Sequence, residues 1–218
     1  MSSTVGHVQS RSAVSSVALA IWATVQLAAL LLSAARIPLS DEFVRPAERA
    51  AVEVMLFTQF CAVAALFPLL MPNAYTVAAV AATSWPFVHL AALLASRPII
   101  NVVSAWVYLV LWIIFLSIWR HLLRNSPRWL LIAATLALCA AVGGAILCYL
   151  RAEFAGADEA SGISALCGPA VAAMGLARAS DSSAGPWLWM GGALSATLAI
   201  WLVLARMSSR TDARSADR

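Results

Sequence analysis

The sequence contains no lysine, and charged residues of all kinds make up only 11% of its 218 residues. Without lysine the chain has no side-chain amine that could form a Schiff base, which excludes retinal-type pigments and lysine-dependent enzymes. A soluble domain carries charge on about a quarter of its residues. The scarcity of charge therefore argues against a soluble globular protein, and it also excludes a disordered chain and a basic surface for nucleic acids.

Cysteine is also scarce, with only Cys61, Cys139, Cys148 and Cys167 in the whole sequence. No two of them form a CxxC pair, and three lie within apolar runs. We therefore interpret them as small hydrophobic residues buried in the protein, and not as metal ligands or disulfide partners. No metal site and no cofactor is predicted.

Hydrophobic residues are abundant, at 62% of the chain, and the mean hydropathy is +0.87. A helix needs about 20 predominantly apolar residues to cross the hydrocarbon core of a membrane, and six stretches meet that length. We predict an all-α, polytopic membrane bundle that occupies residues 1–206, followed by a polar tail at 207–218. The six predicted spans are residues 13–35, 52–71, 74–96, 99–119, 129–150 and 187–205.

The positions of the breaks predict how the spans connect. The second and third spans are so close that they must form a helical hairpin with its corner at Met71-Pro72-Asn73. The second span is expected to end around Pro68 and Pro72, and Arg97 and Pro98 end the third. The fifth and sixth spans are separated by a long loop at 151–186.

The distribution of arginine predicts the orientation in the membrane. With both termini in the cytoplasm, the cytoplasmic segments carry eight arginines against two acidic residues, and the outer segments carry six against eight. Cytoplasmic loops of membrane proteins are the ones enriched in basic residues. We therefore expect both termini in the cytoplasm and the chain in the cell inner membrane. The cytoplasmic arginines are Arg11, Arg120, Arg124, Arg128, Arg206, Arg210, Arg214 and Arg218.

The first span has an alternative interpretation as a signal peptide, since Arg11 precedes an apolar run that ends in Ser33-Ala34-Ala35. The run is longer than the usual hydrophobic region of a signal. Cleavage would also leave an odd number of spans, with the arginine-rich tail still inside. A membrane span is the preferred interpretation.

Few polar side chains lie within the predicted spans, and each is costly in hydrocarbon. Gln26 and Gln59 fall near the middle of the first two spans, where amides can bond helices to each other or line a substrate path. His89 follows Pro86 in the third span. It could be a haem or copper ligand, a proton relay, or a neutral imidazole bonded to a carbonyl that the proline frees. The candidate substrate path consists of Gln26, Gln59, Thr58, Thr83, Ser84 and His89.

Several of the nine tryptophans fall at predicted membrane interfaces, where this residue commonly anchors a helix at headgroup level. An aromatic cage for a cationic ligand is the alternative.

The outer loops contain two short helical segments. Residues 163–176 are apolar but too few to cross a membrane, which predicts a re-entrant or surface-lying helical hairpin broken at Gly168-Pro169. The loop at 38–53 predicts a short amphipathic helix from Pro46, in which Arg45, Glu48, Arg49 and Glu53 are spaced for ion pairs. Neither loop has a catalytic triad, an HExxH motif or a carboxylate pair, so we do not expect an enzyme.

Six spans with cytoplasmic ends and a re-entrant segment before the last span resemble the membrane half of an ABC-2 type exporter. The resemblance implies a dimer of permeases driven by a separate ATPase, because the chain has no GxxxxGK[ST] phosphate loop. The family's charged loop between spans two and three is replaced here by the uncharged stretch from Leu70 to Ala74. The turn containing Arg120, Arg124 and Arg128 is left as the cytoplasmic loop that could dock the partner.

A different class of protein fits the same composition, namely a non-catalytic accessory subunit of a larger membrane complex, respiratory or similar. Such a subunit should have apolar surfaces toward lipid and partner chains and no polar cavity. A permease should instead gather its polar membrane residues around one path. In either case the partners are the lipid bilayer and other membrane chains in a homo- or hetero-oligomer.

Overall fold

The computed structural model describes residues 3–34, 50–71, 74–155, 168–178 and 184–216. Within these ranges, the side chains of residues 3–15, 34, 148–149, 151–155, 201 and 203–216 are outside the description. The described part is entirely helical. Its helices are α1 (Ser3–Ala34), α3 (Ala51–Leu70), α4 (Ala74–Leu94), α5 (Ile99–Leu122), α6 (Pro127–Ala155), α7 (Pro169–Arg178) and α8 (Ala184–Ala216).

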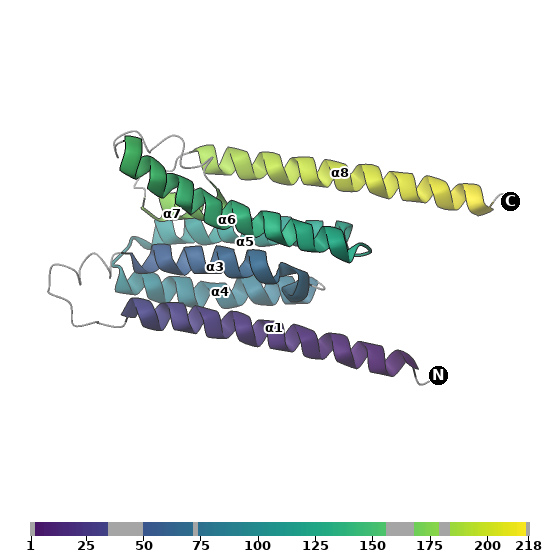
Figure 1. Ribbon diagram of the computed structural model, residues 1–218, viewed down its shortest axis with the longest axis horizontal. Coiled ribbons are helices and arrows are strands. Elements are labelled where there is room, and N and C mark those ends of the chain that lie inside the picture. Colours follow the sequence, from purple (N-terminus) through teal and green to yellow (C-terminus); the bar gives the residue numbers. More distant parts are fainter. Residues whose placement is uncertain (1–2, 35–49, 72–73, 156–167, 179–183, 217–218) are drawn as a thin grey trace.

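The six long helices lie side by side in one bundle and alternate in direction along the chain (Figure 1). The start of α1 and the end of α8 lie at the same end of the bundle, which we call the terminal end (Figure 1). The opposite end, where α7 lies, is called the distal end. Helix α3 is central, since it packs against α1, α4, α5, α6 and α7.

Five helices are long and apolar enough to cross a membrane, through Ser16–Ser33, Ala51–Leu70, Ala74–Leu94, Ile99–Leu122 and Pro127–Leu147. They correspond to the first five predicted spans. The predicted sixth span, 187–205, lies inside the continuous helix α8. Its side chains are described only as far as residue 200 and at Leu202, so the count of six remains a prediction.

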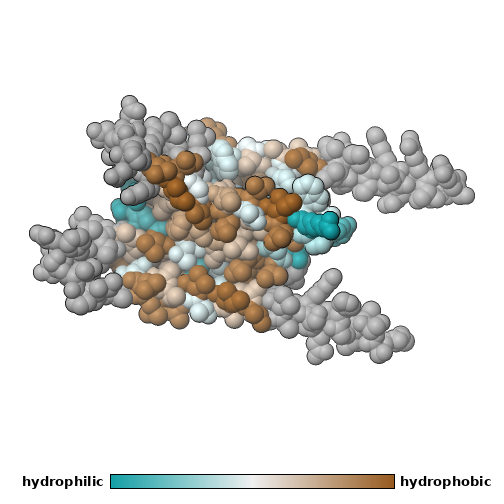
Figure 2. Space-filling view, in the orientation of Figure 1, coloured by the Kyte–Doolittle hydropathy of each residue, from teal (hydrophilic) through white to brown (hydrophobic). Residues whose placement is uncertain are grey.

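The surface of the bundle is apolar along its middle. Figure 2 shows hydrophobic residues over the central part of the visible face and hydrophilic residues toward the two ends. Leu32, Leu136 and Leu188 are 74%, 64% and 74% exposed. Exposing a leucine to water costs about 1.5–3 kcal/mol relative to burying it. A surface of this kind is stable in contact with lipid or with other apolar chains.

Local sequence explains several helix ends. Helix α4 ends in a Schellman motif, in which the Arg97 N–H donates to the Ala92 carbonyl at 3.1 Å and the Ser96 N–H donates to the Leu93 carbonyl at 3.3 Å. Ser96 has a φ of +51°, a position where glycine is usual. Pro98 follows and starts α5, so the predicted stop at Arg97 and Pro98 is confirmed. The motif fixes the direction in which Arg97 leaves α4.

Helix α3 ends close to its predicted boundary, whereas α8 continues beyond its own. Helix α3 runs through Pro68 to Leu70 before the corner at Met71, and Pro72 and Asn73 lie outside the described residues. Helix α8 continues to Ala216, so most of the predicted polar tail is a helical extension. Residues 207–216 contain neither glycine nor proline, and nothing in them interrupts the backbone hydrogen bonds of a helix.

Candidate functional site

A buried layer of polar side chains joins α3, α4 and α5 in the distal half of the bundle. The Gln59 side-chain amide donates to the Ser84 carbonyl at 3.1 Å, and the Trp106 Nε1–H donates to Ser84 Oγ at 2.9 Å. Gln59 and Ser84 are fully buried. Since a buried polar group is stable only when it is hydrogen-bonded, these contacts hold the three helices in register.

Gln26 of α1 is a second buried glutamine, and it is not bonded to this layer. The side chain is fully buried, and neither its amide nitrogen nor its amide oxygen has a partner. A Gln26–Gln59 bond is therefore not formed. One turn away, the Trp22 Nε1–H donates to Thr83 Oγ1 at 3.4 Å, which connects α1 to α4. Leaving a buried amide unpaired costs about 1–3 kcal/mol. Other described residues, among them Tyr108 and Trp112, also have a buried polar atom without a partner.

The other candidate path residues make local contacts. The Thr58 hydroxyl donates to the Val54 carbonyl of its own helix at 2.8 Å, and Thr83 does the same with Ala79 at 2.7 Å. His89 stacks on Trp85, with ring centroids 5.5 Å apart, and its Nδ1 has no partner. The structure thus brings Gln59, Thr83 and Ser84 to the contacts among α1, α3 and α4. Gln26, Thr58 and His89 make no described hydrogen bond to these three residues.

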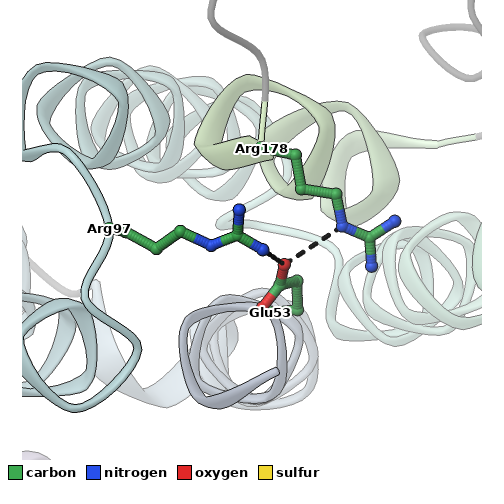
Figure 3. A network of polar contacts seen from close by, with 3 residues as sticks. All are labelled: Glu53, Arg97 and Arg178. Carbon is green, nitrogen blue, oxygen red and sulfur yellow. Dashed lines mark hydrogen bonds and ion pairs between the residues drawn. The ribbon is translucent and has the colours of Figure 1, made fainter. Parts of the chain in front are cut away.

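An ionic cluster lies at the distal end, where Glu53 of α3 accepts two hydrogen bonds on one carboxylate oxygen (Figure 3). Arg97 Nη2 and Arg178 Nε each lie 3.0 Å from Glu53 Oε1. The Glu53 side chain is 7% exposed, against 27% for Arg97 and 63% for Arg178. The cluster ties together α3, the turn before α5, and the end of α7.

The sequence predicted only parts of the ionic cluster and not the contact among its three residues. Glu53 was expected to pair within the loop at 38–53, but Arg45, Glu48 and Arg49 lie outside the described residues, as does the predicted helix from Pro46. Glu53 is instead the third residue of α3 and reaches across the bundle. The sequence did assign Glu53, Arg97 and Arg178 to the same outer side. Their assignment to the same outer side was the signal from which the ion pairs could have been predicted.

Helix α7 is a short helix buried among α3, α5 and α6. It starts at Pro169, at the predicted break, and the Gly168 carbonyl accepts the first helical bond from Ala172 at 3.0 Å. Gly168 has a φ of +135°, and a Cβ there would lie 2.5 Å from the Ala140 carbonyl oxygen. Only glycine permits this approach of α7 to α6.

The depth of α7 follows from its two ends. Its carboxyl end joins the ionic cluster at the distal end, whereas Gly168 contacts α6 near the middle of that helix. Ten residues of helix span about 15 Å, which is half of a hydrocarbon core of about 30 Å. The helix therefore enters the bundle from one end and stops halfway. Residues 169–178 thus lie inside the bundle and not on its surface. Residues 163–167 lie outside the described part, so the re-entrant hairpin stays a prediction.

The arginines proposed for partner docking lie at the terminal end and differ in their environment. Arg120 Nε donates to the Pro68 carbonyl at 2.9 Å and so caps the last turn of α3. Arg124 and Arg128 are exposed. Arg120 is therefore engaged inside the bundle, while Arg124 and Arg128 face outward and can meet a partner.

A groove of about 570 Å³ lies between α4, α5 and α8 in the terminal half. Ala74, Val77, Ala78 and Ala81 form its α4 wall, opposite valine and isoleucine side chains of α5. Arg120 and His121 lie at one end. None of the six candidate path residues lines it. Sequence reasoning missed this groove, although alanines spaced one helical turn apart were a visible signal for a gap between helices.

The cysteines differ from the prediction in one case. Cys61 is half-buried, but Cys139 is exposed on α6, so its thiol is not buried among core residues. The outward face of a membrane helix meets lipid, and apolar residues serve there as well as in the core. Cys148 and Cys167 lie outside the described side chains. Among the side chains that are described, no group of three or more His, Cys, Asp and Glu could hold a metal ion.

No protein-family model, no curated protein and no solved structure matches this chain. Its function is therefore argued from the helices and contacts described above.

Proposed function

We propose that this chain is a six-span integral membrane protein of the cell inner membrane that serves as a non-catalytic subunit of a larger membrane complex. Five apolar helices and the continuous helix α8 support the six spans. The proposal places both termini in the cytoplasm. It is supported by the position of the two helix ends on the same side of the bundle and by the arginine distribution.

One observation favours a structural subunit over a permease with a transport path. Gln59, Thr58, Thr83 and Ser84 make contacts between helices or within their own helix, and the groove has apolar walls over most of its length. A water-filled path needs polar groups that face a shared cavity. In the described part of the chain, Gln59, Thr83 and Ser84 instead hold neighbouring helices together, which suits a structural subunit.

The membrane half of an ABC-type exporter is the second candidate. Two observations favour it, namely the half-length helix α7 and the unpartnered amide of Gln26. Discontinuous helices that stop near mid-membrane are common at transport sites. An exporter of this kind would work as a dimer and would dock its ATPase on the exposed Arg124 and Arg128, with Arg120 holding the end of α3 in place.

Purification of the native complex from its own membranes separates the two candidates. Co-elution of a nucleotide-binding ATPase supports export, whereas co-elution of other integral membrane chains without an ATPase supports the subunit role. A chain that elutes alone and monodisperse would contradict both. The double variant Arg124→Glu and Arg128→Glu should release an ATPase bound at that turn, while the double variant Arg210→Glu and Arg214→Glu, the same charge change in the tail, should not.

A further inference from the structure

Small side chains line much of the α4 side of the groove between α4, α5 and α8. Ala74, Ala78 and Ala81 follow each other at intervals of one turn on one face of α4. Val77 of α4, valine and isoleucine residues of α5 and Leu198 of α8 line much of the rest. A volume of about 570 Å³ remains between these side chains.

Two tryptophans lie just beyond the groove toward the middle of the bundle. Trp85 lies one turn beyond Ala81 on α4, and Trp106 lies one turn before Val110 on α5. Their rings meet edge to face, with centroids 5.1 Å apart. The groove therefore extends from the terminal end only to about half the length of the bundle.

The dimensions fit one acyl chain. From Ala74 to Ala81 and from Val110 to His121 the walls run about 10 Å and about 16 Å, which matches one leaflet of a core about 30 Å thick. A groove of about 570 Å³ along walls of this length has room for one extended acyl chain.

The open end carries the polar groups that a lipid headgroup would meet. Arg120 is held there by its bond to the Pro68 carbonyl, and Ser117 and the exposed His121 lie beside it. The exposed Arg124 and Arg128 follow within two turns. The only acidic side chain that the structure describes, Glu53, lies at the opposite end of the bundle. Charge complementarity therefore favours an anionic headgroup.

We propose that this groove is a binding site for one anionic phospholipid of the leaflet at the terminal end. One acyl chain lies along the alanine face of α4 up to the Trp85–Trp106 pair, and the phosphate lies at Arg120 and His121. The site goes beyond the role of a membrane subunit and rests on it only in that the chain must be inserted in a bilayer.

Native mass spectrometry of the full chain, extracted in detergent and supplied with phosphatidylglycerol or phosphatidylcholine, tests the site. We expect phosphatidylglycerol to be retained about tenfold better, the size of one charge-assisted contact. Ala78→Phe fills the groove and should reduce that retention about tenfold. Ala23→Phe is the matched control, because Ala23 is exposed on α1 away from the groove, and it should retain lipid as the parent does.

His121→Gln tests the headgroup end separately, and we expect it to reduce the preference for phosphatidylglycerol while leaving phosphatidylcholine retention unchanged. Equal retention of both lipids, or no difference between Ala78→Phe and Ala23→Phe, would overturn the proposal. Inorganic phosphate that displaces the lipid at millimolar concentration would also overturn it, since the site would then bind free phosphate. So would loss of a dimer in Ala78→Phe without loss of lipid. Carbonate extraction of the same membranes reports insertion independently and separates failure of this site from failure of the proposed function.

Discussion

The two halves of the bundle differ in how the space between their helices is filled. Six long helices cannot meet closely at every level, and in the distal half the remaining space is occupied by α7, by the ionic cluster and by tryptophan rings. In the terminal half the alanines of α4 leave a groove open. The distal half therefore contains the specific, position-dependent contacts, whereas the terminal half tolerates changes in its side chains.

The largest expected effect in this comparison is at Gly168. Gly168→Ala places a methyl group 2.5 Å from the Ala140 carbonyl oxygen at a φ of +135°, and we expect a loss of about 3–5 kcal/mol of stability or failure of α7 to insert. Thermal unfolding in detergent measures it. Gly175→Ala is the control in the same helix, since its Cβ meets nothing within 4 Å, and it should be neutral or stabilising by up to about 1 kcal/mol. Equal effects would mean that α7 is not packed against α6.

The second effect concerns the ionic cluster. Glu53→Gln replaces the carboxylate that pairs with both arginines by a neutral amide and leaves Arg97 partly buried without a counter-charge, so we expect a loss of about 3 kcal/mol. Arg178→Gln should cost about 1 kcal/mol or less, because that side chain is 63% exposed. Denaturant unfolding of both variants shows which one loses more stability. If Arg178→Gln proves to be the more costly variant, the cluster is less open to solvent than its exposure indicates.

A smaller effect distinguishes the two buried glutamines of the distal half. Gln26→Leu removes an amide without partners and should stabilise the protein by about 1 kcal/mol, whereas Gln59→Leu breaks the bond to Ser84 and should destabilise it by a similar amount. Unfolding curves of both variants and the parent give the sign of each change in the free energy of unfolding. Destabilisation by Gln26→Leu would show that Gln26 has a partner outside this chain.

The smallest effect is expected at the turn that positions Arg97. Ser96→Gly relieves the left-handed backbone at φ +51° and should stabilise the protein by about 0.5 kcal/mol. Ser126→Gly, at a turn outside a Schellman motif, should not stabilise it. The midpoint of chemical unfolding measures both. No gain at Ser96 would mean that the turn is held by the ion pair of Arg97 and not by its backbone.

Apolar runs predicted most of the helices, because the length of such a run and its breaks at Pro98 or Gly168-Pro169 are local properties of the sequence. The buried polar layer was predicted in composition but not in pairing, since Gln59 bonds to a backbone carbonyl whose position depends on how α4 packs. The ionic cluster required three segments to meet and could not be derived from spacing. The groove depends on the space that small side chains leave between helices, and no single residue of the sequence indicates that space.

The ionic cluster also constrains the order in which the protein is assembled. Glu53 and Arg178 are 125 positions apart in the chain, whereas Glu53 and Arg97 are 44 apart. During synthesis Arg97 can pair with Glu53 well before the ribosome reaches Arg178. The Glu53 carboxylate therefore has a counter-charge while the rest of the chain is still being made. Helix α7 is synthesised after α1, α3, α4, α5 and α6, so Arg178 joins a carboxylate that Arg97 can already pair.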